Sequence, residues 1–234
     1  MRVSVCMATY NGEKYIAKQI DSILNQLDNE DEMVISDDSS TDDTRVIIAR
    51  YAQNDARIKF IQGPCKGFAK NFENAIKNAS GNIIVFADQD DIWSEGKVDK
   101  IRAVFEEKTQ YTTVLHTMKT FYNDQCYENT IKVKYRKGVL VNWLKSCYWG
   151  CCMAVKYEFI NKMLPFPDEC ISHDQLIGLV SEKKGATYFL NEDLIMHRIH
   201  SSNKTRKLPL MDKLIFRFKL CVQYIYCIHN WKEK

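Results

Sequence analysis

Short apolar runs alternate with amphipathic stretches through the first half of the chain. The runs predict strands at 2–8, 32–36, 57–62 and 82–87. Between the first two, Ile16, Ile20 and Ile23 recur at helical spacing and predict a helix over 13–27. Further helices are expected over 68–79, ended by a cap at 80–81, and over 94–108. Such alternation is typical of βαβ units around a mainly parallel sheet.

Boundaries are less regular elsewhere. After the second strand, Ser40 followed by Asp43 predicts a capping box that opens a helix. In the second half, strands are expected at 111–118 and 150–155, with a polar stretch at 123–129 between them. We therefore predict one large α/β domain over residues 1–203 and an appended tail over 204–234.

Composition indicates a globular protein. Of 234 residues, 45% are hydrophobic and 27% charged, which argues against both a disordered chain and a membrane bundle. The nine cysteines are spread along the chain without zinc-ribbon spacing, so we expect free thiols in a reducing cytosol. The first residues enter a strand pattern without the features of a signal peptide. A cytoplasmic location is expected.

The positive charge of the chain belongs to its tail. Residues 204–234 carry eight basic and two acidic side chains, whereas the net charge of the whole chain is +3. The apolar runs in 208–231 are shorter than the roughly 20 residues needed to span a bilayer. This basic amphipathic segment could bind the inner face of the membrane peripherally, or pack on the domain with its basic face in water. The acidic remainder of the chain argues against nucleic acid as a partner.

Polar clusters follow three of the predicted strands, at 9–12, 37–38 and 88–91. In a mainly parallel sheet, ligands bind outside the carboxyl ends of the strands. Crowded carboxylates repel one another unless a cation compensates them, and Mg²⁺ or Mn²⁺ prefers oxygen ligands. Asp90 could hold the metal while Asp88 contacts a ribose or a metal-bound water. Alternatively, these aspartates could cap the helix beginning near Ser94.

Three segments together resemble the family 2 glycosyltransferases, which are inverting enzymes with the GT-A fold. They are Ala8-Thr9-Tyr10-Asn11-Gly12, Ser36-Asp37-Asp38-Ser39-Ser40 and Asp88-Gln89-Asp90-Asp91-Ile92-Trp93, and the resemblance extends over residues 2–203. It implies a Rossmann-type, mainly parallel sheet flanked by helices, with a C-terminal helical tail. It also implies a nucleotide-sugar binding half at 1–108 and an acceptor half at 109–203.

The same resemblance implies a reaction. A sugar would pass from a UDP- or dTDP-linked donor to a hydroxyl of a glycan or lipid-linked acceptor in surface polysaccharide synthesis, with Mn²⁺ or Mg²⁺ as cofactor. Asp174 would be the catalytic base, and Asp90, Asp88 and His200 the metal ligands. The donor would be bound by Thr9, Tyr10, Asn11, Asp38, Lys66, Lys70, Asp88 and Arg198. Helix capping remains the alternative for Asp38 and Asp174, and packing for His173.

Two other functions use similar residues. A nucleotidyltransferase also places aspartates and a metal at a sheet edge, but the first strand is not followed by a glycine-rich phosphate loop with a signature lysine. A non-catalytic nucleotide-sugar or carbohydrate binding protein would need no base at Asp174. Sugar transfer is the function that the three segments favour.

Overall fold

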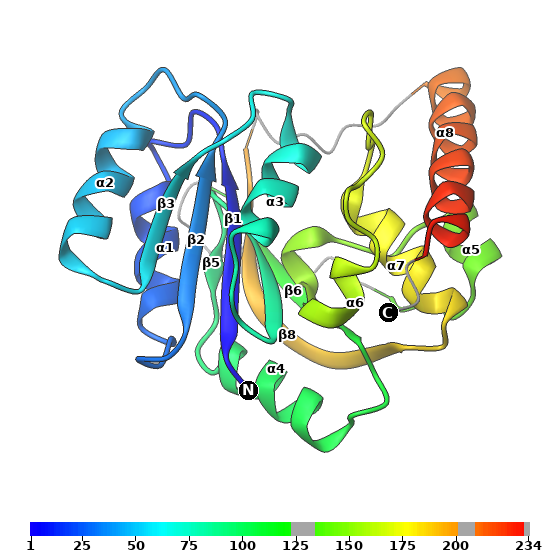
Figure 1. Ribbon diagram of the computed structural model, residues 1–234, viewed down its shortest axis with the longest axis horizontal. Helices are drawn as coiled ribbons and strands as arrows, with labels where there is room; N and C mark the ends of the chain where they lie inside the picture. Colours follow the sequence, from blue (N-terminus) through cyan, green and yellow to red (C-terminus); the bar gives the residue numbers. More distant parts are fainter. Residues whose placement is uncertain (123–133, 201–208, 232–234) are drawn as a thin grey trace.

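A computed structural model describes residues 1–122, 134–200 and 209–231 and shows a central sheet between layers of helices (Figure 1). The strands are β1 (Val3–Thr9), β2 (Glu32–Asp37), β3 (Ile58–Gln62), β4 (Ile83–Asp88), β5 (Ile92–Trp93), β6 (Thr113–Tyr122), β7 (Met153–Lys156) and β8 (Thr187–Ile199). The helices are α1 (Ile16–Leu24), α2 (Thr44–Asn54), α3 (Phe68–Lys77), α4 (Lys97–Glu107), α5 (Val139–Leu144), α6 (Tyr157–Asn161), α7 (His173–Lys183) and α8 (Leu210–His229), with a 3-10 helix η1 (Gly150–Cys152).

The sheet has the order β3-β2-β1-β4-β7-β6-β8-β5. Strands β1 to β4 are parallel, β6 is parallel to β8, and β7 and β5 are antiparallel to their neighbours. The expected mainly parallel sheet flanked by helices is confirmed. Parallel strands bring the loops after β1, β2 and β4 to one edge, because their carboxyl ends point the same way.

Alternate side chains of the central strands pack into two separate hydrophobic cores, one on each face of the sheet. Val3, Val5 and Met7 of β1 pack with α1, α2 and α4, whereas Cys6 and Ala8 pack with α3, α6 and α7 on the opposite face. Period-two alternation of an apolar strand predicts this arrangement when both faces are covered. The result is a sheet buried on both sides.

Several predicted boundaries are wrong. Ser40 does not cap a helix, because its hydroxyl donates to Asp37 Oδ2, and α2 begins at Thr44 without a side-chain cap bond. Helix α3 ends at Lys77 with Asn78 as C-cap, before the expected cap at 80–81. Residues 150–152 of the strand expected at 150–155 form η1 instead, and the strand itself, β7, covers 153–156.

Two strands escaped prediction, and both matter for the site. Strand β5 is only two residues long, and β8 mixes polar and apolar residues without a clear period. They pair with Ile92 opposite Met196. That register brings the end of β8 back to the residues that follow β4.

Helix α8 stands at the right-hand side of the view in Figure 1, against α5 and α7 and away from the sheet. Leu220, Gln223 and Cys227 form its buried face. Within the described ranges, no helix combines the length and the apolar composition needed to cross a membrane. The expected boundary between domain and tail at 203–204 lies outside the described residues, and the domain division stays a prediction.

Candidate active site at the carboxyl edge of the sheet

A buried aspartate fixes the loops after β1 and β2. Asp37 has no exposed surface, and its carboxylate accepts hydrogen bonds from Thr9 Oγ1 (2.9 Å), Ser40 N (2.9 Å) and Ser40 Oγ. The amide of Asn11 accepts from Thr41 N at 2.8 Å. Thr9 and Asn11 therefore hold the two loops together, and a donor-binding role for them stays a prediction.

Gln89 joins the loop after β1 to the loop after β4. Its side chain accepts from Tyr10 N (2.9 Å) and donates to the carbonyl of Tyr10 (3.0 Å). A Cβ on Gly12 would lie 2.5 Å from Gln89 Oε1, so only glycine fits there without displacing the amide. The Tyr10 side chain is 55% exposed at this edge. An exposed aromatic ring beside a polar pocket suits stacking with a flat ligand.

Asp38 does not cap α2. Its two carboxylate oxygens accept from Cys65 N (2.6 Å) and Gly67 N (2.9 Å), which ties the loop after β3 to the end of β2. Lys66 lies between these donors, in an exposed position. Lys70 is half-buried, and its ammonium donates to Glu73 Oε2 (3.0 Å) and to the carbonyl of Phe166 (2.7 Å). Neither lysine is placed against another predicted donor-binding side chain.

The acidic residues after β4 divide into two pairs with histidines. Asp91 is 1% exposed and accepts from His197 Nδ1 at 2.8 Å and from Arg198 N at 3.1 Å. Asp90 Oδ2 lies 2.8 Å from His200 Nε2. The antiparallel pairing of β5 with β8 explains both contacts, because it places 90–91 beside 197–200. None of these aspartates caps α4, whose N-cap is Gly96 without a side-chain bond.

Arg198 supports the same turn. Its Nε donates to the carbonyl of Asp90 at 2.9 Å, and its guanidinium lies 4.7 Å from the ring centre of Tyr15 and 4.4 Å from that of Phe121. Stacking of this kind holds the planar group in one orientation. The side chain is buried, so a diphosphate would have to reach it from the edge of the sheet.

We call Asp88, Asp90 and Asp91 the acidic cluster. Burial and mutual repulsion change the pKa values of Asp88 and Asp90. Burial raises the pKa of Asp88 well above its usual range, and the charges of Asp91, Asp90 and Asp174 raise it further. Burial also raises the pKa of Asp90, together with the charge of Asp91, although His200 opposes both. For His197, burial alone would lower the pKa, but the bonds to Asp91 and Cys151 raise it to about 11.

A buried lysine lies beneath the cluster. Lys97 has no exposed surface, donates to the carbonyl of Cys151 at 3.1 Å and lies 4.0 Å from the ring centre of Trp93. Burial lowers its pKa to about 8, although nearby thiols, Asp91 and Asp88 favour the charged form. Its ammonium offsets part of the negative charge above it.

Asp174 lies in the first turn of α7, and Ser172 Oγ and Gln175 N both donate to Asp174 Oδ1. The preceding residue, His173, is fully buried and stacks on Phe72 with ring centres 4.6 Å apart. Burial lowers the pKa of His173, so the imidazole is neutral. His173 therefore packs as expected. The Cβ of Asp174 lies 3.7 Å from the position of a Cβ on Gly150, and the charge of Asp174 contributes to the raised pKa of Asp88.

One group of three potential metal ligands occurs among the described residues, and it is not the predicted set. Atoms of Asp91, Cys151 and His197 lie within 4.8 Å of one another. Metal binding needs a deprotonated thiol and a neutral imidazole. Here the hydrogen bond with Cys152, with burial, raises the pKa of Cys151 well above its usual range, and His197 keeps its proton beside Asp91. We interpret this group as a buried ion pair.

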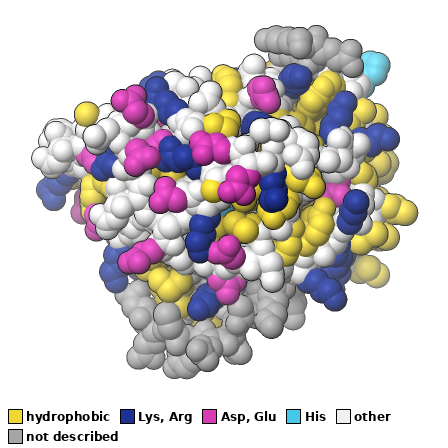
Figure 2. All heavy atoms as spheres, turned by 90° about the horizontal axis from the view of Figure 1, so that it is seen from below, with side chains coloured by type: hydrophobic (Ala, Val, Ile, Leu, Met, Phe, Trp, Pro, Cys, Tyr) yellow, Lys and Arg dark blue, Asp and Glu magenta, His cyan; other side chains and the backbone are white. Residues whose placement is uncertain are grey.

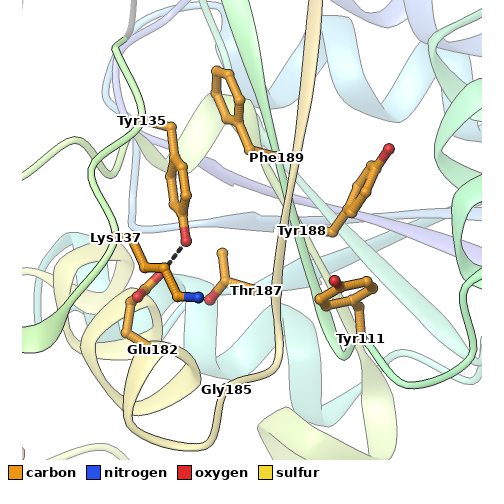
Figure 3. A pocket seen from close by; sticks show the side chains of 8 residues that line it. All are labelled: Tyr111, Tyr135, Lys137, Glu182, Gly185, Thr187, Tyr188 and Phe189. Carbon is orange, nitrogen blue, oxygen red and sulfur yellow. Dashed lines mark hydrogen bonds between the residues drawn. The ribbon is translucent and has the colours of Figure 1, made fainter.

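A cavity of about 310 Å³ lies elsewhere in the fold (Figure 3). It is lined by Tyr111, Tyr188 and Thr187 at the amino ends of β6 and β8, and by Tyr135, whose hydroxyl donates to Glu182. Asp88, Asp90 and Asp91 lie at the other edge of the sheet, beside the carboxyl end of β8. This cavity is therefore separate from the acidic cluster.

Sequence reasoning missed Gln89, the Asp91–His197 pair and Lys97. Gln89 stands out as the only non-acidic residue of the 88–91 segment. Its partners are the backbone N–H and carbonyl of Tyr10, which no side-chain pattern in the sequence indicates. Asp91 and His197 are 106 residues apart, and only the pairing of β5 with β8 brings them together. Lys97 appeared as an ordinary first-turn lysine, and nothing in its neighbours along the chain indicates burial.

Known proteins resemble this chain in sequence and in fold. TuaG of Bacillus subtilis, a putative teichuronic acid biosynthesis glycosyltransferase, is 37% identical over 93% of this chain and 87% of its own length. WfgD of Escherichia coli, a UDP-Glc:alpha-D-GlcNAc-diphosphoundecaprenol beta-1,3-glucosyltransferase, is 30% identical over 70% of this chain. This match covers 64% of WfgD, so the chain spans less than two thirds of that relative.

Solved structures share the whole fold. Staphylococcus aureus TarS 1–349 in complex with UDP-GlcNAc superposes with a TM-score of 0.76 at 22% identity, covering 100% of this chain and 68% of TarS. The mannosyltransferase PcManGT of Pyrobaculum calidifontis, in complex with GDP-Man and Mn²⁺, gives 0.65 at 17% identity, covering 98% and 72%. The GT-A fold is thereby confirmed. The model of glycosyl transferase family 2 matches residues 4–164, and the chain belongs to this family.

Proposed function

We propose that this protein is an inverting glycosyltransferase that moves a sugar from a nucleoside-diphosphate donor to a hydroxyl of a glycan or lipid-linked acceptor. The observation that carries the proposal is the meeting of two parts at one edge of the sheet. Asp91 lies there within 4.8 Å of Cys151 in η1, and Asp174 of α7 lies against the same 3-10 helix, with its Cβ 3.7 Å from the position of a Cβ on Gly150. A metal–phosphate site beside a carboxylate base is what such a transfer requires.

Asp90 and His200 are the residues that fit a divalent cation. Their ligand atoms lie 2.8 Å apart, close to the roughly 3.0 Å between neighbouring ligands of an octahedral ion with bonds of about 2.1 Å. Asp88 would complete the set through a metal-bound water, since it does not form a group of three with them. Bound Mn²⁺ or Mg²⁺ would neutralise the charge of the leaving diphosphate. PcManGT, a structural neighbour, holds Mn²⁺ with its donor.

The donor would lie along the loops after β1, β2 and β3. Tyr10 offers an exposed ring to the base, and Asp38 can accept from a pyrimidine N–H, since each of its oxygens has a further lone pair. Thr9 and Asn11 shape the pocket floor. Arg198 faces the diphosphate, with Lys66 and Lys70 on the loop side. TarS binds UDP-GlcNAc, WfgD is named for UDP-glucose and RfbG of Shigella flexneri is a dTDP-rhamnosyl transferase, which together support a UDP- or dTDP-linked donor.

Asp174 would remove the proton from the acceptor hydroxyl as that oxygen attacks the anomeric carbon. Ser172 Oγ and Gln175 N both donate to Asp174 Oδ1, which holds the carboxylate in one orientation at the start of α7. Attack from the side opposite the leaving diphosphate inverts the configuration. Release of pyrophosphate from a nucleoside triphosphate would instead indicate a nucleotidyltransferase.

The names of two relatives support the proposed acceptor. WfgD acts on a lipid-linked diphosphoundecaprenol sugar and TuaG is assigned to teichuronic acid synthesis. We therefore propose that this chain acts in surface polysaccharide synthesis on the cytoplasmic side of the membrane.

The test replaces Asp174 by Asn. Thermal-shift screening with nucleotide sugars and Mn²⁺ first identifies the donor, and release of nucleoside diphosphate in the presence of a lipid-linked acceptor then measures transfer. D174N should lower turnover by about 10²- to 10⁴-fold while donor affinity stays unchanged. Asp99→Asn is the matched control, because Asp99 is also a first-turn aspartate, on α4. Retention of most turnover in D174N would exclude Asp174 as base.

A further inference from the structure

Helix α8 has a second apolar face that no part of the described structure covers. Its 20 residues give a length of about 30 Å. The buried face packs on α5 and α7, yet large apolar side chains also project into solvent along the whole helix. They include Leu214 (58% exposed), Phe218 (70%), Val222 (51%) and Ile225 (59%). At 100° per residue, the exposed apolar side chains from Leu210 to Tyr226 fall within an arc of about 160°.

Helix α5 extends this surface. It contacts α8, and Trp143 Nε1 donates to the carbonyl of Arg217 at 2.9 Å. Three of its six residues are exposed and apolar, namely Leu140 (67%), Val141 (46%) and Leu144 (63%). We call the exposed apolar side chains of α5 and α8 the apolar patch. Isolated exposed leucines are common, but a patch spanning two packed helices marks a contact surface.

Cations border the apolar patch. Lys213 and Lys219 are exposed on α8, and Lys137 and Lys145 flank α5. Figure 2 shows Lys and Arg side chains among the hydrophobic ones on the side of the molecule where α8 lies. Acids near the patch in the described part of the chain include Asp212, Glu182, which accepts from Gly138 N, and Glu169, which lies 3.7 Å from Lys219. Apolar side chains bordered by cations match an anionic bilayer surface, where the apolar groups enter the acyl boundary and the cations meet the headgroups.

The patch is also connected to the candidate base. On α8, Arg217 Nη1 donates to Gln175 Oε1 at 2.8 Å, next to Asp174, and Gln223 Oε1 accepts from Ile171 N at 3.3 Å. Gln223 also donates to the carbonyl of Glu169 at 2.6 Å. The helix that carries the patch is thus bonded to the segment that leads into Asp174. A membrane bound at the patch would lie beside the acceptor side of the site.

We propose that α5 and α8 together form a docking surface for an anionic lipid bilayer, which presents a lipid-linked acceptor to Asp174. The role of the acceptor rests on the proposed function, whereas the docking itself does not. A second copy of this chain is the competing occupant. It would bury the apolar side chains equally well but would gain nothing from the lysines around them.

The test is sedimentation of the full chain with vesicles of phosphatidylcholine, alone or mixed with phosphatidylglycerol. The wild type should bind the mixed vesicles more tightly. The double variant Phe218→Ser and Ile225→Ser should weaken binding about a hundredfold, at about tenfold for each side chain removed. Leu140→Ser with Leu144→Ser should also weaken it, because α5 belongs to the same surface. Val46→Ser is the matched control, since Val46 is 48% exposed on α2, outside the patch.

Lys213→Glu with Lys219→Glu provides a variant that keeps the apolar side chains. It should lose the preference for phosphatidylglycerol. The proposal would be overturned if the wild type sedimented with neither kind of vesicle, or if the serine variants bound the vesicles as tightly as the wild type. The proposal would also be overturned if light scattering showed a dimer of the wild type that F218S converts to monomers, because the patch would then be a dimer interface. Calorimetry of UDP binding to the wild type with Mn²⁺, without vesicles, separates the two proposals. A wild type that binds vesicles but not UDP would contradict the proposed sugar transfer and leave the docking proposal standing.

Discussion

At the residue scale, the bond between Asp91 and His197 is the interaction whose loss should cost most. Both side chains are nearly buried, so removing one leaves an uncompensated charge. His197→Gln should destabilise the fold by about 3–5 kcal/mol at neutral pH. Exposed His229→Gln is the control. Urea unfolding of both variants measures the difference, and equal stability would show that the pair contributes nothing.

The same pair predicts a pH dependence. Burial alone would lower the pKa of His197, but its bonds to Asp91 and Cys151 raise it from 6.5 to about 11 in the folded state. A raised pKa stabilises the fold below the unfolded value, and this stabilisation disappears as pH rises through the folded value. The stability gap between wild type and H197Q should therefore narrow from pH 6.5 towards 11.

How far the sequence predicts residues depends on whether their partners are local. Asp90, the expected metal ligand, is half-buried in the strand-end turn, whereas Asp91 is buried, and the ligand role of Asp90 stays a prediction. That His200 lies beside Asp90 agrees with the resemblance, although its role as ligand stays a prediction. The burial of Lys97 was not predictable, since it depends on η1, which is distant in sequence.

At the element scale, the seat of α7 on Tyr148 is tight. A Cβ on Gly178 would lie 2.4 Å from Tyr148 Cγ, whose ring is buried. Gly178→Ala should destabilise by about 1–3 kcal/mol through this overlap, although the same change in an exposed helix stabilises by about 1 kcal/mol. In a double-mutant cycle with Tyr148→Leu, the combined loss should be smaller than the sum of the single losses. Strict additivity would mean that the overlap has no effect.

Elements with a strong period were predicted well, and elements fixed by pairing were not. The first four strands begin and end within two residues of expectation, because apolar runs between helices define them. Strand β8 has no such period, since its register with β6 is broken by bulges and its residues 195–196 also pair with β5 on the other side. The capping box at Ser40 failed because Asp37 competes for the same hydroxyl.

At the scale of the whole molecule, α8 packs on α5 and α7 and is bonded to residues 171 and 175. A chain that ends after residue 200 loses the bonds of Arg217 and Gln223 and uncovers the surfaces packed on Leu220 and Cys227. Its melting temperature should fall by several degrees, at about 4–8 °C for each kcal/mol in a domain of about 100 residues and less in a larger one. The F218S and I225S chain keeps the buried face and should melt like wild type. A truncated chain of unchanged stability would show that α8 is an independent appendage.

The tail also shows what composition leaves open. Its charge and mixed apolar pattern allowed either a packed helix or an interfacial one, and packing was expected to leave a basic face in water. The structure packs one face and leaves mainly apolar side chains on the other. An α-helix that is apolar around most of its circumference can bury either face. The positions of α5 and α7 determine which face of α8 is buried in the protein.

The glutamine between the two loops has a thermodynamic consequence. Gln89 is bonded on both sides of its amide to Tyr10, and it stands between Asp88 and Asp90 in the chain. Under the proposed function, a nucleotide that orders the backbone at Tyr10 would also order the carboxylates on either side of Gln89. Occupancy of the two subsites is then reciprocal: the factor by which metal tightens nucleotide binding equals the factor by which nucleotide tightens metal binding. Shortening Gln89 to Ala would separate the two equilibria.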